Sequence, residues 1–259
     1  MIRATYINHM GDDLTVVNAA RVSFGKKKEA LGYTGAEGGA MRPILADGDL
    51  KLIRYLAKHR HMSPFGHCFV SFHVKAPIFV ARQLVKHKFL RWNEISRRYV
   101  DDEPEFFCPN EWRGRSVDAK QGSTGVVNMG DSKSPYNCIG RAEWAALECY
   151  QQLLDQGVCP EQARMVLPQS TMTEWYWSGS LDAFADMCNL RLKDDTQEET
   201  RHIAHQISQV MLDLFPNSWQ PLLTSRPLSV PIAEYGKIRE MTEDEKQRGK
   251  EKSIANGRR

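Results

Sequence analysis

A strand-like segment that runs directly into an amphipathic helix is the feature that most constrains this fold. Residues 67–76, HCFVSFHVKA, are rich in aromatic and β-branched side chains, which favour a strand. Pro77 follows at a position that the first turn of a helix tolerates. The run from Ile78 to about Leu90 then places four apolar residues on one helical stripe: Ile78, Ala81, Val85 and Phe89. A strand and a helix joined so directly indicate a domain that mixes the two.

Strand and helix signals alternate along the rest of the chain. Residues 1–24 are expected to form a strand, a turn at Gly11 and a helix, and TMTEWYWSG, residues 171–179, to form another strand. A capping box of Thr196 and Glu199 predicts a helix that extends to about Leu214. The other expected helices are 47–60, 141–156, 160–168 and 181–191. Neither a repeat nor a linker interrupts this pattern, which predicts a single α+β domain with several long helices.

Some segments lack this periodicity. Residues 25–47 are rich in Gly, Lys and Ala and are expected to form an excursion without a core of its own. Residues 113–137 hold four glycines and predict a long loop. We expect the folded domain to span residues 1–234 and the strongly charged residues 235–259 to form a flexible tail.

Composition and charge point to an ordinary globular protein. The formal net charge of the 259-residue chain is only +3, so no global field demands a polyanionic partner. No apolar run approaches membrane-spanning length, and no secretion signal is present at the N-terminus. The six cysteines are scattered without a Cys-x-x-Cys pair, which is typical of free thiols in a reducing compartment. We therefore expect a cytoplasmic protein with no membrane partner.

The sequence lacks the motifs of several common sites. It holds no G-x-G-x-x-G for a dinucleotide, no G-x-x-x-x-G-K-[ST] for a triphosphate, and no G-x-S-x-G for serine hydrolysis. His59, His61 and His67 invite a zinc site, but their spacing is a weak ligand pattern. No metal site is expected.

Residues 86–99, KHKFLRWNEISRRY, concentrate Lys, Arg and His side chains around one carboxylate. Three interpretations are open: a nucleic-acid-binding patch, a solvated helix face, or the wall of a site for a small anion. The cations are spaced, and polar side chains alternate with them, which favours the third: Asn93, Glu94, Ser96 and Tyr99. Aromatic residues are few and no known pattern for nucleic acid fits, so no nucleic-acid partner is expected.

This stretch resembles the signature of the flavin-dependent thymidylate synthases, the ThyX family, written R-H-R-x-x-S-x-N-E-x-S-x-R-Y. The positions that match in register are His87, Asn93, Glu94, Ser96, Arg98 and Tyr99. Upstream, HMSPFGH is similar to the family's H-x-[TS]-P-F-E-H block. Downstream, ARMVLP and NLRL are similar to two further blocks, and Gln197 and Glu199 keep part of an A-Q-x-E pattern. The resemblance covers roughly residues 14–215.

The resemblance implies a fold, an activity and an assembly. The fold would be a mostly antiparallel sheet flanked by long helices. The activity would be the FAD-dependent conversion of dUMP to dTMP, with 5,10-methylenetetrahydrofolate as one-carbon donor and NADPH as reductant, releasing tetrahydrofolate. A homotetramer would share its active sites between subunits, and the FAD would bind without a Rossmann fingerprint.

The resemblance also implies roles for individual residues. Those expected to bind dUMP are Gln83, Glu94, Ile95, Ser96, Arg97, Arg98, Arg164 and Arg191. Those expected to bind FAD are His61, Ser63, Lys86, His87, Lys88, Phe89, Glu94 and Asp186. The catalytic residues would be Arg191, which grips the uracil edge, together with Ser96 and His61. Ser96 is expected to act as a ligand rather than a nucleophile, and His67 to be a core or supporting histidine.

The sequence departs from the family pattern at several positions. Gly66 replaces a glutamate, Arg91 a serine, Asp186 an amide and Asp195 a frequent histidine. Lys86 and Lys88 stand where the signature has arginines, which preserves charge but not the bidentate fork. We expect the grip on the flavin diphosphate to be rebalanced and not lost. The alternatives are a nucleic-acid-binding module and a degenerate relative that binds nucleotide without turnover.

Overall fold

The structure of the protein is a computed structural model that describes residues 1–35, 41–100, 102–117, 122–127, 135–224 and 236–239. Its centre is a four-stranded sheet in the order β1 (Arg3–Met10), β4 (Phe69–Pro77), β9 (Met172–Ser180) and β5 (Leu90–Glu94). Every neighbouring pair is antiparallel. This confirms the expected α+β class and the mostly antiparallel sheet.

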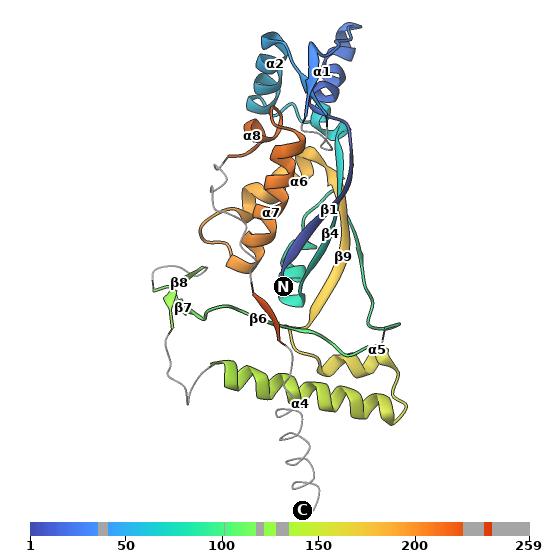
Figure 1. Cartoon of the computed structure of the whole chain (residues 1–259), viewed down its shortest axis with the longest axis vertical. Coiled ribbons are helices and arrows are strands. Elements are labelled where there is room, and N and C mark those ends of the chain that lie inside the picture. Colours follow the sequence, from blue (N-terminus) through green and yellow to red (C-terminus); the bar gives the residue numbers. More distant parts are fainter. Residues whose placement is uncertain (36–40, 101, 118–121, 128–134, 225–235, 240–259) are drawn as a thin grey trace, which may run out of the picture.

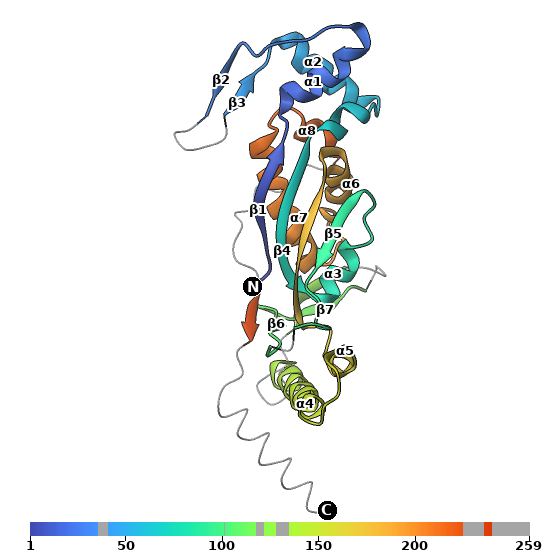
Figure 2. The same ribbon diagram turned by 90° about the vertical axis from the view of Figure 1, so that its right-hand side faces the viewer.

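Burial alternates along the central strand β4, so one face of the sheet is buried and the other is more open. Its inward residues are fully buried: Val70, Phe72, Val74 and Ala76. The alternate residues on the other face are only half-buried. Helices α6 (Leu181–Arg191) and α7 (Glu198–Leu214) lie along the buried face, and Figure 2 looks onto the strands with these helices behind them. The sheet thus has one helix-covered face, as antiparallel sheets commonly do.

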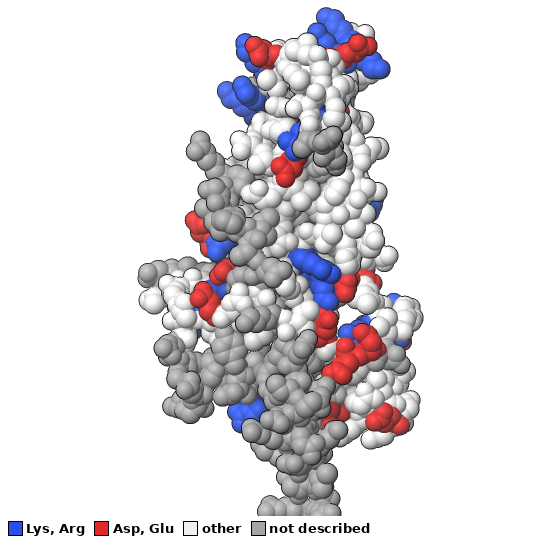
Figure 3. All heavy atoms as spheres, in the orientation of Figure 1, with Lys and Arg blue, Asp and Glu red and all other residues white. Residues whose placement is uncertain are grey.

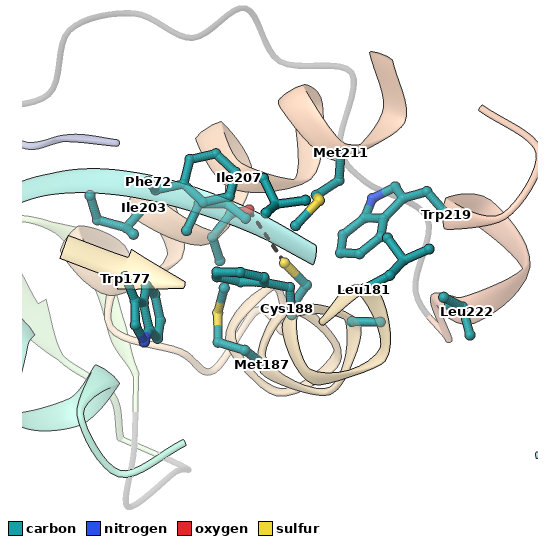
Figure 4. Close-up of a cluster of buried hydrophobic side chains, with 14 of the residues drawn as sticks. Phe72, Trp177, Leu181, Met187, Cys188, Ile203, Ile207, Met211, Trp219 and Leu222 are labelled. Carbon is teal, nitrogen blue, oxygen red and sulfur yellow. Dashed lines mark hydrogen bonds between the residues drawn. The ribbon is translucent and has the colours of Figure 1, made fainter. Parts of the chain in front are cut away.

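The core lies between this face and the two helices, as Figure 4 shows. The rings of Phe72 and Phe184 meet edge to face with centroids 5.3 Å apart. Cys188 is fully buried among apolar side chains, and its Sγ lies 3.6 Å from the carbonyl oxygen of Ala204. Burial raises the pKa of the Cys188 thiol, so this residue packs as a small apolar side chain.

The remaining elements gather at the two ends of the sheet (Figure 1). At one end lie α1 (Asp13–Arg21), η1 (Val22–Phe24), β2 (Gly32–Thr34), β3 (Arg42–Ile44), α2 (Asp47–Lys58), η2 (Ser63–His67) and α8 (Trp219–Leu222). Toward the other lie α3 (Ile78–Leu84), β6 (Phe106–Cys108), β7 (Arg113–Arg115), β8 (Ser123–Val126), α4 (Pro135–Asp155), α5 (Pro160–Ala163), η4 (Arg164–Val166) and β10 (Lys237–Arg239). The expected helices at 47–60, 160–168 and 181–191 are confirmed to within a few residues.

The helix predicted from Ile78 to Leu90 is wrong in its second half. Helix α3 ends at Leu84, and Phe89 has a left-handed backbone with φ of 64°. The Phe89 side chain is 83% exposed, so it does not share a buried stripe with Ile78. Residues 90–94 instead pair with β9, because Gly179 opposite Leu90 leaves room for the incoming strand. A Cβ at Gly179 would clash with the Leu90 side chain and lie 3.2 Å from the Phe89 carbonyl oxygen.

Three other expectations need correction. Gln197 is the N-cap of α7, and the capping box of Thr196 and Glu199 does not form, because the Thr196 hydroxyl donates to the Leu190 carbonyl. The expected loop 113–137 contains the β7–β8 hairpin and the start of α4, while residues 118–121 and 128–134 lie outside the described residues. Within the expected tail, Lys237–Arg239 pairs with β6 as strand β10. Residues 240–259 lie outside the described part, so the domain boundary stays a prediction.

The described residues show neither a basic stripe on the face of Figure 3 nor a membrane-spanning helix. On the face shown in Figure 3, the Lys and Arg side chains of the described residues are scattered among acidic ones and form no continuous stripe. Among the residues that the structure describes, no helix is long and apolar enough to cross a membrane.

Replacing Phe72 by Ala tests the packing of this core. The side chain is fully buried, so we expect Phe72→Ala to lower the free energy of unfolding by about 3–5 kcal/mol in a urea titration followed by circular dichroism. Val117, which is 92% exposed, is the control, and Val117→Ala should change it by less than about 0.5 kcal/mol. Equal effects of the two substitutions would contradict the described core.

Candidate active site

Part of the expected ligand set lies at the two ends of strand β5. Lys86, Lys88 and Phe89 precede the strand, and Ile95 to Arg98 follow it. Six residue steps along the extended strand, from Phe89 to Ile95, separate these two groups by about 20 Å at 3.3 Å per residue. The segment is therefore a turn, a short strand and a second turn, and its cations do not line one helix face. This removes the basis for a solvated helix face.

Arg191 connects the ends of two helices. It is the last residue of α6, and its Nη2 donates to the Gln83 carbonyl oxygen in the last turn of α3 at 2.9 Å. Its Nε donates to Nε2 of His87 at 3.0 Å. The carbonyl end of a helix carries partial negative charge, which favours a guanidinium there. These contacts occupy two of the five N–H donors of Arg191 within the described part of the chain.

His87 serves Arg191 as a neutral acceptor. Burial, with a smaller contribution from the charge of Arg191, lowers the pKa of the His87 imidazole from 6.5 to about 4. Because Nε2 accepts a hydrogen bond, the proton of the neutral ring lies on Nδ1. At neutral pH the imidazole therefore orients the guanidinium without repelling it.

The side chain of Gln83 points toward α7. Its Nε2 donates to Gln197 Oε1 at 2.6 Å, and its Oε1 accepts from the Thr200 hydroxyl at 3.2 Å. Both ends of the amide are thus engaged within the chain. Gln197 and Thr200 were not among the residues predicted for the site, although Gln197 belongs to a matching block.

Glu94 is oriented at the far end of β5 by two further residues. Its Oε1 accepts from the Thr173 hydroxyl at 2.7 Å and its Oε2 from the Trp92 indole N–H at 3.0 Å. The Trp92 ring stacks on Trp175 with centroids 4.2 Å apart. Arg91 alternates with Trp92 and lies opposite Ser178 on the other face of the sheet. The departure at Arg91 thus affects the sheet face that no described helix covers.

A cavity of about 660 Å³ opens beside Glu94. That volume falls within the range typical of small-molecule sites. Its walls include four residues expected to bind dUMP, namely Glu94, Ile95, Arg97 and Arg164. Arg82 also lines it, at a helical spacing of four from Ile78, and sequence reasoning did not single it out. Not among the lining residues are Gln83, Ser96, Arg98 and Arg191.

The residues after β5 form a polar turn. The Ser96 hydroxyl accepts from Arg98 Nε at 3.1 Å, and the guanidinium of Arg98 lies 5.0 Å from the centre of the exposed Tyr99 ring. Arg97 Nη1 donates to the carbonyl oxygen of Asp102 at 2.9 Å. On the other wall of the cavity, Arg164 Nε donates to the Glu161 carbonyl at 3.2 Å. The hydrogen bonds that the Ser96 hydroxyl accepts in the described part of the chain come from Arg98, and its role as a ligand stays a prediction.

The other residues expected to bind FAD lie near the end of the sheet where β5 begins. His61 and Ser63 are exposed just before β4, and Asp186 is exposed on α6, 3.8 Å from Arg60. Lys86 and Lys88 are exposed as well. Two exposed ammonium groups and an exposed aromatic ring, that of Phe89, form a set that fits a flavin nucleotide with its diphosphate.

The departures from the family pattern lie in open or distant surroundings. At Gly66 a Cβ would meet nothing closer than the Asp182 Oδ1 atom, 3.9 Å away, so the missing glutamate leaves space. Asp195 packs near Gly122, the residue before β8. His67 is exposed and lines a hollow of about 500 Å³ against α1, so it is not a core histidine, and the alternative of a supporting histidine stays a prediction. Among the described residues, no group of three His, Cys, Asp or Glu could hold a metal ion.

Comparison with known proteins bears on this arrangement. A family model described as thymidylate synthase complementing protein matches residues 5–217. The chain is 37% identical to a flavin-dependent thymidylate synthase of Thermus thermophilus over 213 residues, 82% of this chain and 72% of that one. It is 35% identical to that of Thermosipho africanus over 217 residues, 84% of this chain and 89% of that one.

A solved structure agrees in fold. The crystal structure of the UMP/dUMP methylase PolB from Streptomyces cacaoi, bound with 5-Br dUMP, superposes with a TM-score of 0.71 at 30% identity. The match covers 85% of this chain and 94% of that one. Sequence and structure therefore agree that the chain belongs to the family of flavin-dependent thymidylate synthases.

Proposed function

We propose that this chain converts dUMP to dTMP as a flavin-dependent thymidylate synthase. The observation that carries the proposal is the pair of contacts made by Arg191. One is to a residue expected to bind dUMP and the other to a residue expected to bind FAD. Arg191 donates to the Gln83 carbonyl and to the ring of His87, which belongs to the signature block. Family membership and the cationic cavity beside Glu94 support the same conclusion.

The proposed cofactor is FAD, with 5,10-methylenetetrahydrofolate as one-carbon donor, NADPH as reductant and tetrahydrofolate as a product. A bound flavin would supply the hydride chemistry, while the protein supplies binding, orientation and electrostatics. The residues proposed to hold it are His61, Ser63, Lys86, His87, Lys88, Phe89, Glu94 and Asp186. Their support is the exposed donor set at the start of β5 and the matching signature.

The nucleotide would bind beyond the other end of β5. Arg97 and Arg164 in the cavity wall suit a phosphate because guanidinium groups bind phosphate in a bidentate manner. Ser96, Arg98 and the backbone of Ile95 would add neutral and charged donors. We propose that Arg191 directs its remaining N–H donors to the uracil edge and stabilises negative charge that develops on a ring carbonyl. His61 is proposed to lie beside the reacting rings.

We propose a homotetramer with active sites shared between subunits. In one chain the cavity collects Arg97 and Arg164, but Arg191 does not line it. A site that requires all three arginines would be completed by a second copy. Light scattering should then give a mass four times the 29.6 kDa of one chain. We further propose that the enzyme acts in the cytoplasm, where its six free thiols would remain reduced.

Absorbance and product formation test the proposed function. The protein, purified and supplied with FAD, should retain a flavin band after gel filtration and form dTMP from dUMP, methylenetetrahydrofolate and NADPH. Flavin and dUMP binding without dTMP would identify the degenerate relative. Salt-dependent oligonucleotide binding without a chromophore would identify the nucleic-acid-binding module. Either result would refute the synthase.

Arg191→Ala should lower kcat/KM for dUMP by about 100-fold or more, because it removes donors aimed at developing charge. Arg191→Lys should restore only part of this loss, since an ammonium cannot reproduce the guanidinium fork. Lys51→Ala on the exposed face of α2 is the control and should behave as wild type. Full dTMP formation by Arg191→Ala would remove the central residue of the proposal.

The low pKa of His87 predicts a pH dependence of stability. The unfolded chain takes up a proton on this ring near pH 6.5, whereas the folded chain does so only near pH 4. The contribution of neutral His87 to the free energy of unfolding is therefore full above pH 6.5 and is lost as the pH falls from 6.5 to 4. In urea titrations at a series of pH values, His87→Asn should show a shallower loss than wild type over this window. Identical slopes would show that His87 is not held neutral.

A further inference from the structure

We propose that Arg113, on the β7–β8 hairpin, is a positioning residue for the nucleotide site. It holds the first turn of α7, so that Gln197 and Thr200 fix the amide of Gln83 next to Arg191. This inference rests on the proposed function, because it assigns Gln83 and Arg191 to the nucleotide site. Arg113 lies in a segment whose sequence predicts only a loop.

The contact of Arg113 with α7 has the geometry of a strong ion pair. Its Nη2 lies 2.7 and 2.8 Å from the two carboxylate oxygens of Glu199, and its Nη1 lies 3.0 Å from Oε2 of Glu198. Its Nε donates to the Ser123 hydroxyl of β8 at 3.0 Å. The side chains of Arg113 and Glu199 are only 16% and 4% exposed, so water screens this pair weakly. Such a pair fixes both the distance and the orientation of the first turn of α7 relative to the β7–β8 hairpin.

The start of α7 depends on this outside contact. Gln197 is the N-cap but makes no side-chain hydrogen bond to the first turn. Its amide instead accepts from Gln83 Nε2 at 2.6 Å, and Thr200 donates to Gln83 Oε1 at 3.2 Å. Glu198 and Glu199 lie between these two residues, and Arg113 contacts both of them. The position of the first turn therefore decides where both partners of Gln83 lie.

Gln83 transmits this position to Arg191. Its side-chain amide is held by α7, and its backbone carbonyl accepts from Arg191 Nη2 at 2.9 Å. A shift of the first turn of α7 would pull on Gln83 and change where the guanidinium of Arg191 points. A misplacement of about 1 Å in a positioning contact is enough to lower a rate about 100-fold. Arg113 would thus act through Gln83 without touching the substrate.

A double-mutant cycle between Arg113 and Gln83 separates positioning from mere folding support. Arg113→Met should raise the dissociation constant of dUMP for the holoenzyme, measured by calorimetry, and lower kcat/KM by about tenfold. In the Gln83→Ala background the same substitution should have little further effect, because the transmitting residue is gone. Arg115→Met is the matched control, since Arg115 is exposed on the same strand, and it should match wild type.

Two milder variants keep the test decisive if Arg113→Met does not fold. Arg113→Lys keeps the charge but loses the guanidinium whose two terminal nitrogens reach Glu198 and Glu199, and Glu199→Gln keeps the shape but loses the charge. Both should weaken dUMP binding in the wild-type background and not in Gln83→Ala. Equal fold-changes in the two backgrounds, or none in either, would overturn the inference while dTMP formation by the wild type still supports the proposed function. A wild-type holoenzyme that binds no dUMP would overturn both.

Discussion

The hydrogen bonds of Arg191 to the Gln83 carbonyl and to His87 join two helices that begin at opposite ends of the sheet. Helix α3 starts after Pro77 and α6 after Ser180, and the antiparallel pairing of β4 with β9 places these residues at opposite ends. The two helices run toward each other and meet at their C-terminal ends. A guanidinium suits that junction because helix carbonyls carry partial negative charge, and a neutral imidazole accepts from it without repulsion.

Strand β5 organises the rest of the candidate site. Its pairing with β9 directs Lys86 to Phe89 toward one end of the sheet and Ile95 to Arg98 toward the other. Alternation along the strand keeps Trp92 and Glu94 on one face, where Trp175 and Thr173 orient them, and places Arg91 on the other. Gly179 suits this arrangement because a Cβ there would clash with the Leu90 side chain and crowd the Phe89 carbonyl oxygen.

Much of the fold was predictable because its signals are local. The aromatic and β-branched content of β4, and the helices expected at 47–60 and 181–191, depend on residues close together in the sequence. The end of α3 was not predictable in this way, since the residues after it leave the helix and pair with β9, which is distant in the sequence. The capping box at Thr196 does not form because α7 has Gln197 as its N-cap, and the Glu199 carboxylate contacts Arg113 from a distant hairpin.

The family signature predicts a set of site residues, whereas the contacts made by Trp92, Thr173 and Thr200 emerged only from the folded chain. We propose that β5 separates the flavin-binding residues Lys86 to Phe89 from the residues that bind the nucleotide phosphate, Ile95 to Arg98 and Arg164. This separation is tested most directly by measuring flavin absorbance and dUMP binding for Lys86→Ala/Lys88→Ala and for Arg164→Ala. The first variant should lose most of its flavin band and the second should keep the band but bind dUMP weakly. Loss of both ligands to the same extent in both variants would contradict the separation.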